Sequence, residues 1–177
     1  MASHYNKKLV LLLLLLAAPV IEFGSARKKK LKKTNLTFYM EDYQTGSNVT
    51  AVPVAGVNGT KTGILNFSAV YVIDNRLTEG PENSSLEIGR GRGMYTNSAL
   101  DGTDLQLVIS VVFSNGKFNG STLQIQGSDR VLLQRREVSV VGGTGYFRFG
   151  RGYAVLETAF LYASTLNIVV DVTVLHY

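Results

Sequence analysis

Apolar and polar residues alternate along most of the chain after residue 35, the pattern of strands that turn one face to a core. The longest alternating runs lie at 36–41, 105–113 and 166–174. A shorter run at 70–73 is apolar at every position, which predicts a strand buried on both faces. Clusters of Gly, Asn and Ser separate the runs and suit tight turns; they lie at 46–48, 57–59, 114–117 and 119–121.

This pattern predicts about eight strands and no long helix, which makes the chain an all-β single domain. We expect an eight-stranded antiparallel β-barrel, because closure removes exposed edges and eight strands are just wide enough to enclose a small ligand. A sandwich of two sheets is the main alternative.

Two glycine-containing segments predict turns inside the second half of the chain. Residues 142–145 read Gly-Gly-Thr-Gly after an apolar run, and residues 127–129 read Gly-Ser-Asp. The first segment superficially resembles a phosphate-binding loop. However, Tyr146 and Phe147 follow it and no amphipathic helix comes after them, so a nucleotide-binding site is excluded.

The first 26 residues predict a secretory signal peptide. Lys7 and Lys8 precede an unbroken apolar run of ten residues at 9–18, and small residues stand at 24–26. The run is too short to cross a bilayer, and no other segment is long and apolar enough, so no membrane span is expected. A basic arm at 27–33 and a barrel domain at 34–177 complete the predicted organisation.

The net charge of +5 is concentrated near the N-terminus, since the arm at 27–33 carries six Lys and Arg residues. Residues 34–177 carry ten basic and twelve acidic side chains and are therefore mildly acidic. A basic tail on a secreted protein suits an acidic wall polysaccharide such as pectin and does not indicate nucleic acid. A merely solvated arm is the alternative interpretation.

The absence of cysteine and the scarcity of histidine exclude several kinds of catalytic and metal-binding site. The chain has no cysteine, and its two histidines are His4 and His176. Thiol catalysis, thiolate metal sites and an ordinary Ser-His-Asp triad are therefore excluded, and neither a metal nor a cofactor is expected. The sequence accordingly predicts no redox chemistry carried by this chain alone.

Six Asn-x-Ser/Thr sequons accompany the predicted signal peptide and indicate a glycosylated extracellular protein. The acceptor residues are Asn35, Asn48, Asn58, Asn66, Asn83 and Asn119.

Several polar residues occupy positions that alternation assigns to the barrel interior. Asp42 has the parity of Phe38, and Arg136 has the parity of Val138. Together with Asp129, they form either a structural Asp–Arg ion pair or a polar cluster that lines a pocket and transfers protons. Tyr95 shares a face with the glycines at 89–93, where it either meets a ligand or packs in the core.

Five blocks, in order and at plausible spacing, resemble the plant dirigent proteins over nearly all of the chain after the leader. They lie at 36–42, 72–81, 89–95, 120–127 and 136–153. The resemblance implies an eight-stranded barrel of the kind shared with allene oxide cyclase. It also implies assembly as a homotrimer, with a dimer as the alternative, and secretion to the apoplast.

The resemblance also implies roles for individual residues. Asp42, Asp129 and Arg136 match the family's catalytic positions, and Tyr95 matches a substrate-binding position. Asn97 is assigned a second substrate-binding position, because it stands where some lignan-forming members have a second pocket Tyr, and Glu41 stands where many members have His. In the implied mechanism, a carboxylic acid protonates a quinone-methide oxygen, or a carboxylate deprotonates the attacking hydroxyl.

The resemblance implies a protein that guides the coupling of phenoxyl radicals, such as those from coniferyl alcohol, into optically active lignans. A separate laccase or peroxidase makes the radicals. The alternative is a quinone-methide lyase that dehydrates isoflavanols to pterocarpans, and a second alternative is a non-catalytic cell-wall or defence glycoprotein. Whether the protein is an enzyme is therefore left open, and in the first two cases the substrate is a phenolic small molecule.

Overall fold

The computed structural model describes residues 30–57, 59, 63–162 and 165–177, so the predicted signal peptide and the sequon at Asn58 lie outside the described residues. The strands of the described part are β1 (Lys32–Tyr43), β2 (Ala51–Ala55), β3 (Val70–Thr78), β4 (Glu87–Asn97), β5 (Asp104–Phe113), β6 (Thr122–Arg130), β7 (Arg135–Thr144), β8 (Arg151–Tyr162) and β9 (Thr165–His176). Two short 3-10 helices, η2 (Gly116–Phe118) and η3 (Gly145–Phe147), follow β5 and β7. Within these ranges, no helix is long and apolar enough to cross a membrane.

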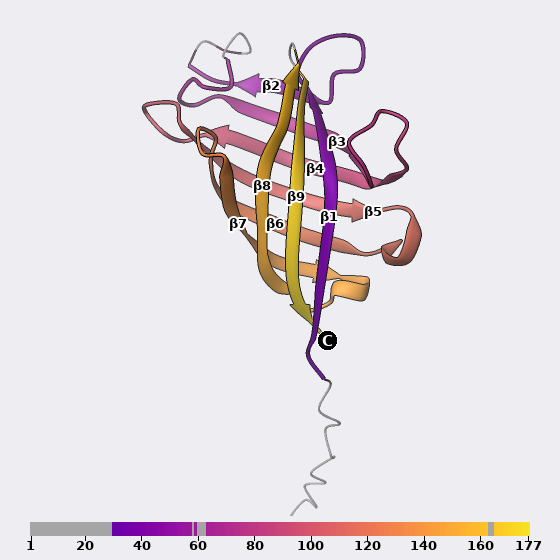
Figure 1. The fold of residues 1–177 in the computed structure, drawn as a ribbon. Helices are drawn as coiled ribbons and strands as arrows, with labels where there is room; N and C mark the ends of the chain where they lie inside the picture. The colour runs from indigo at the N-terminus through magenta and orange to yellow at the C-terminus, as the bar shows by residue number, and fades with distance from the viewer. Residues whose placement is uncertain (1–29, 58, 60–62, 163–164) are drawn as a thin grey trace, which may run out of the picture.

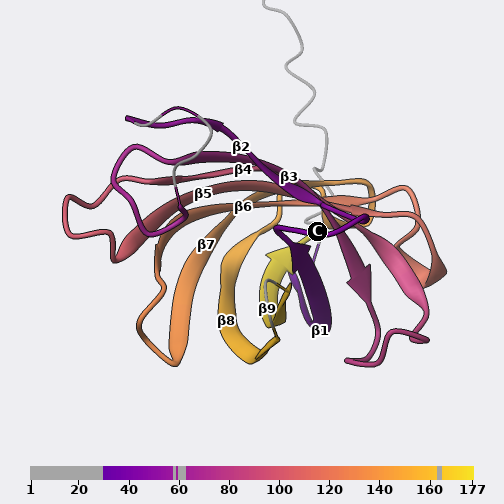
Figure 2. The same ribbon diagram turned by 90° about the horizontal axis from the view of Figure 1, so that it is seen from above.

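Eight strands form a closed antiparallel ring in the order β1-β9-β8-β7-β6-β5-β4-β3. The ring closes where residues 39–41 of β1 pair with residues 76–78 of β3. In Figure 1, β8, β9 and β1 run in front of the strands behind them, and Figure 2 shows the curved wall of β7, β8, β9 and β1 facing the flatter group of β2 to β6. The predicted eight-stranded barrel is confirmed, and β2 is an additional short strand that pairs with β3.

Side chains alternate between the interior and the solvent as the sequence pattern predicts. On β5, every second side chain from Leu105 to Phe113 is buried. The prediction that 70–73 is buried on both faces is wrong, because Val72 is 46% exposed while Tyr71 and Ile73 are buried. The reason is geometric, since each wall of a barrel has only one face toward the core.

The predicted turn at 127–129 is also wrong, since these residues continue strand β6. Gly127 has a φ of 152° and lies against Val138, so the chain passes through this point in a conformation that glycine tolerates. The turn falls instead at 131–134. Likewise, residues 142–144 still belong to β7, where a register shift against β6 leaves Val141 as the extra residue, and the turn begins only at Gly145.

The basic arm and the barrel share a boundary inside β1. Lys32 and Lys33, the last lysines of the predicted arm, pair with His176 and Leu175 of β9.

One end of the barrel is filled by aromatic side chains whose neighbouring rings lie 4.9–5.7 Å apart. These side chains are Phe113, Phe118, Tyr146, Phe147 and His176.

Glycines in β4 allow the strand to approach its neighbours closely. A Cβ on Gly93, whose φ is 153°, would overlap the carbonyl oxygen of Val108 on β5. Gly91 faces inward, but the one tight contact of a Cβ there would be the flexible Sδ of Met40, at 3.2 Å, with Leu77 in ordinary contact at 3.5 Å. The space beside Gly91 is thus occupied by protein side chains rather than left for a ligand.

We predict that Gly93→Ala destabilises the fold by roughly 3 kcal/mol, because both the backbone conformation and the approach of β5 require glycine. Gly91→Ala, on the same strand, should cost only about 1 kcal/mol, since Met40 can shift. Urea unfolding of both variants tests this expectation, and equal losses of stability would contradict it.

Candidate functional site

A cavity of about 480 Å³ lies inside the barrel, in the size range of pockets that hold small organic ligands. It lies near the ends of β1, β4 and β6 and the starts of β5, β7 and β9. Its lining is mostly apolar, with Leu, Ile, Val and Met side chains from several strands. The polar side chains of the lining are Asp42, Gln44, Tyr95, Asp129, Arg136 and Thr158.

Asp42 is the carboxyl group of β1 in this cavity, and it is only 3% exposed. Its Oδ2 accepts a hydrogen bond from Nδ2 of Asn75, at 3.2 Å, while its Oδ1 is buried without a hydrogen-bond partner. Burial raises the pKa of Asp42, and the neutral groups of Asn75, Gln44 and Tyr95 only partly offset this effect. The arrangement therefore favours a neutral carboxylic acid that can donate a proton.

Tyr95 lies close to Asp42 and stacks on Tyr71, with ring centroids 5.1 Å apart. Its hydroxyl is buried and makes no aligned hydrogen bond. Burial raises the pKa of Tyr95, and the nearby carboxyl group of Asp42 adds to this effect. The phenol is therefore neutral near pH 7 and can donate a hydrogen bond to a ligand in the cavity.

The second carboxyl group, Asp129 of β6, is paired with a cation. Its Oδ1 lies 2.8 Å from Nε of Arg136 on β7, and each residue is 6% exposed. These two atoms form an ion pair without the alignment of a hydrogen bond, whereas Nη1 of Arg136 donates to Oγ1 of Thr158, at 2.9 Å. Burial raises the pKa of Asp129, the guanidinium of Arg136 lowers it, and Asp104 raises it slightly.

The structure thus brings four of the five predicted site residues into one cavity, and Asn97 is the exception. Asn97 is buried but does not line the cavity. Its Nδ2 donates to the carbonyl oxygens of Ile64 and Gly102, both at 2.9 Å, and its Oδ1 accepts from the backbone of Ala99. Contrary to the substrate-contact role suggested by the sequence, Asn97 holds together two loops beside the cavity.

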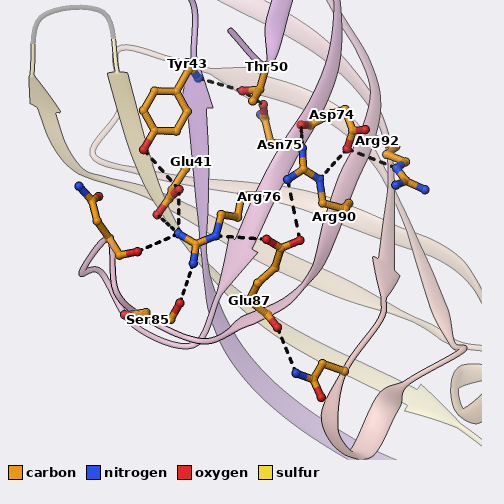
Figure 3. A network of polar contacts seen from close by, with 12 residues as sticks. Glu41, Tyr43, Thr50, Asp74, Asn75, Arg76, Ser85, Glu87, Arg90 and Arg92 are labelled. Carbon is orange, nitrogen blue, oxygen red and sulfur yellow. Dashed lines mark hydrogen bonds and ion pairs between the residues drawn. The ribbon is translucent and has the colours of Figure 1, made fainter. Parts of the chain in front are cut away.

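Glu41, the residue that departs from the common His, takes part in an ion network outside the cavity. Nη1 of Arg76 lies 3.3 Å from Oε1 of Glu41, and Nε of Arg76 lies 3.2 Å from Oε2 of Glu87 (Figure 3). The same guanidinium donates to the carbonyl oxygens of Asn83 and Ser85. Glu41 therefore ties β1 to β3 and to the loop between β3 and β4.

The sequons of the described part are accessible, since each of their asparagines is exposed. These asparagines are Asn35, Asn48, Asn66, Asn83 and Asn119. Exposure allows glycosylation at each position and does not by itself select among them.

Sequence reasoning missed Gln44 and Thr158 in the lining and Asn75 behind Asp42. Asn75 carried a usable signal, because it shares the inward parity of Tyr71 and Ile73 on β3. Gln44 follows the end of β1, where alternation no longer predicts which way a side chain points.

Among the described residues, no group of three or more His, Cys, Asp or Glu side chains is placed to hold a metal ion.

The fold and the cavity define a closed β-barrel with carboxyl and phenol groups in an apolar cavity of the size that small ligands occupy. The family model for dirigent-like proteins matches residues 33–176. The chain therefore belongs to the dirigent family.

Curated relatives and a solved structure agree with this assignment. The chain is 42% identical over 127 residues to dirigent protein 11 of Arabidopsis thaliana, covering 72% of this chain. It is 43% identical over 124 residues to pterocarpan synthase 1 of Glycyrrhiza echinata, covering 70% of this chain. In both cases the match spans 66% of the relative, just under two thirds. The structure of the pterocarpan synthase dirigent protein GePTS1 is similar with a TM-score of 0.78 at 36% identity, covering 85% of this chain and 88% of that one.

We predict that Asp42→Asn gains stability relative to the wild type as the pH rises from about 4 to 7. The pKa of Asp42 is raised in the folded state, so its stabilising contribution is fully present below the unfolded pKa of about 3.9 and is lost as the pH rises through the folded pKa. Asparagine does not titrate and escapes this loss. Urea unfolding at several pH values gives the difference between the two proteins.

Asp101→Asn is a control of opposite sign. Hydrogen bonds from Thr103 lower the pKa of Asp101, so its contribution is present above the unfolded pKa and is lost as the pH falls. This variant should therefore lose stability relative to the wild type as the pH rises toward the unfolded pKa of about 3.9, with little further change above it. A stability difference between Asp42→Asn and the wild type that does not change with pH would show that Asp42 ionises normally.

Proposed function

We propose that this protein catalyses stereoselective proton transfer on a phenolic substrate that passes through a quinone-methide-type intermediate, as in the dehydration of an isoflavanol to a pterocarpan. The observation that carries the proposal is the pair of buried carboxyl groups in one apolar cavity. Asp42 has only neutral groups acting on its pKa, whereas Asp129 is paired with Arg136. Different environments assign different roles to chemically identical groups.

In the proposed reaction, neutral Asp42 donates its proton to the leaving hydroxyl, and the C–O bond breaks as water departs. The resulting cation is a protonated quinone methide, whose charge is spread over the phenol ring. A second phenolic hydroxyl of the substrate attacks the carbon that lost water, and ionised Asp129 takes its proton. The net change is the loss of one water, and solvent returns the proton from Asp129 to Asp42.

The remaining polar groups suit this scheme. The 2.8 Å ion pair with Arg136 favours the ionised form of Asp129 and offsets part of the rise in its pKa that burial causes. The hydroxyl of Tyr95 is available to a phenolic or carbonyl oxygen of the substrate. The apolar walls exclude water, which strengthens these electrostatic interactions and holds the substrate in one orientation.

The second candidate is guidance of phenoxyl-radical coupling, supported by the family of the chain and by its lack of cysteine and scarcity of histidine. In that case a separate laccase or peroxidase supplies the radicals, and the cavity orients them. The same carboxyl groups then serve the ring closure that follows coupling. A non-catalytic wall or defence glycoprotein is the remaining alternative, and it requires no phenolic ligand.

We further propose that the protein is secreted to the apoplast and glycosylated, with the basic arm bound to an acidic wall polysaccharide. The leader at 1–26, the exposed sequons and the six charges of the arm support this proposal. None of these features bears on the chemistry inside the barrel.

We also propose that the protein assembles as a homotrimer through an apolar row on the outer wall. Val52, Val72, Met94 and Val108 are neighbours across β2, β3, β4 and β5, and each is 46–49% exposed. A contiguous apolar row on the outer face of a sheet is typical of a surface that contacts another protein.

The proposed function predicts that the purified protein converts a 2′-hydroxyisoflavanol to one pterocarpan enantiomer without any oxidase. Asp129→Asn should retain the fold and lower product formation roughly 10²-fold or more, the usual contribution of a general acid or base. Asp104→Asn, which removes a nearby carboxyl group outside the cavity lining, is the matched control and should remain active. Chiral chromatography of the product is the measurement.

Three other outcomes would reject this function. Optically active lignans from coniferyl alcohol, formed only with an added oxidase, would favour the coupling guide. If Asp129→Asn is destabilised by about 3–5 kcal/mol and the chirality of the product is unchanged, the ion pair has only a structural role. Absence of any bound phenol or product would favour the wall glycoprotein.

The trimer predicts that Val72→Glu yields a folded monomer, because three buried carboxylates near the symmetry axis would repel one another. Val141→Glu places the same change at an exposed valine on β7, away from the apolar row, and should remain trimeric. Light scattering after size-exclusion chromatography gives the mass. A wild-type protein that is monomeric at micromolar concentration would refute the trimer.

A further inference from the structure

Asn75 is a fully buried amide on the inward face of β3, among Tyr71, Ile73 and Leu77. A buried amide without partners would be strongly destabilising, so its hydrogen bonds must be satisfied within the protein. Its Oδ1 accepts from Oγ1 of Thr50, at 2.7 Å, and its Nδ2 donates to Oδ2 of Asp42, at 3.2 Å. Asn75 therefore connects Thr50 to the carboxyl group in the cavity.

The first donor in this chain of hydrogen bonds is a backbone N–H of β1. The N–H of Tyr43 can only donate, and it donates to Oγ1 of Thr50, at 3.0 Å (Figure 3). Because Thr50 accepts there, its hydroxyl proton is free to point away from β1, and in the structure it is donated to Oδ1 of Asn75. In this arrangement the NH2 group of Asn75 faces Asp42.

We propose that Thr50 and Asn75 are positioning residues that determine which oxygen of Asp42 carries the proton. The NH2 group of Asn75 occupies the acceptor side of Oδ2, so the proton of the neutral acid resides on Oδ1. Oδ1 makes no aligned hydrogen bond within the described part of the chain, and it belongs to a residue that lines the cavity, with Gln44 and Tyr95 close to the same carboxyl group. The acid is thereby directed at a ligand.

Loss of the Thr50 hydroxyl would release this constraint. The amide of Asn75 could then rotate and present its oxygen to Oδ2, which would draw the proton of Asp42 to Oδ2. Oδ1 would become an acceptor, and the cavity would lose its acid. The same rotation removes a donor to the carboxylate and supplies an acceptor to the acid, so it favours the protonated form.

The other ionisable groups around Asp42 are not altered when the Thr50 hydroxyl is removed and the amide of Asn75 rotates. Tyr71 on β3 and Tyr95 on β4 lie close to it, and Asp129 and Arg136 face the same cavity from β6 and β7. Its partner on β9 is the apolar Leu166. A change in the titration of Asp42 on mutation of Thr50 therefore reports on the amide of Asn75.

The test is the carbon-13 NMR titration of the Asp42 carboxyl group in Thr50→Val, with the signal assigned through Asp42→Asn. We expect the pKa of Asp42 to rise in Thr50→Val and to stay at the wild-type value in Thr50→Ser, which retains the hydroxyl. Thr78→Val is the control, because it removes a buried hydroxyl of β3 that donates to the carbonyl oxygen of Gly80. This control should leave the pKa of Asp42 unchanged.

An unchanged pKa in Thr50→Val, or an equal shift in Thr78→Val, would overturn the proposal. Asn75→Leu, which removes the donor entirely, should raise the pKa as well and provides a second measurement if Thr50→Val does not fold. One consequence of the inference rests on the proposed function: we expect Thr50→Val to lower product formation about tenfold or more. The titration needs no substrate, so it tests the positioning role even if isoflavanols prove not to be substrates.

Discussion

Closure of the sheet by β1 is the constraint on which the rest of the structure depends. β1 pairs with β9 over its whole length but with β3 over only three residue pairs. This short seam turns an open sheet with two edges into a barrel with an interior. Asp42 lies immediately after the seam, so the strand that closes the barrel also delivers an acid to the cavity.

A closed interior forces every polar side chain inside it to find a partner, and the two ends of the barrel differ in how this is achieved. At one end, aromatic rings fill the space, and His176 is buried with its Nε2 against Thr34. At the other end, Asp42 accepts a hydrogen bond from Asn75, and Asp129 is paired with Arg136. Both acids line the cavity, and the proposed proton transfer depends on them.

Alternation in the sequence predicted the strands and directed Asp42 and Arg136 inward, because a regular strand keeps its parity. It left a barrel and a two-sheet sandwich as alternatives, and the family resemblance favoured the barrel. The prediction of a turn at 127–129 was wrong, because Gly127 lies within a strand although its positive φ is a conformation that glycine commonly adopts in turns. Alternation also failed for Asn97, because parity predicts burial but does not reveal whether a buried amide faces a ligand or a loop backbone. The role of Thr50 depends on a contact between residues 25 positions apart, which no local pattern contains.

The buried acids also explain why the barrel needs its long ladders. Burial of carboxyl groups disfavours their ionised form, so each ionised carboxylate reduces stability at neutral pH unless a cation or donor offsets the loss. Asn75 offsets part of this loss for Asp42 and Arg136 does so for Asp129, and neither removes the shift. The remaining destabilisation is tolerated because twelve-residue pairing between β1 and β9 and extensive apolar burial hold the wall in place. A more stable barrel would require apolar side chains in place of each acid and its buried partner together, at the expense of the groups proposed to transfer protons.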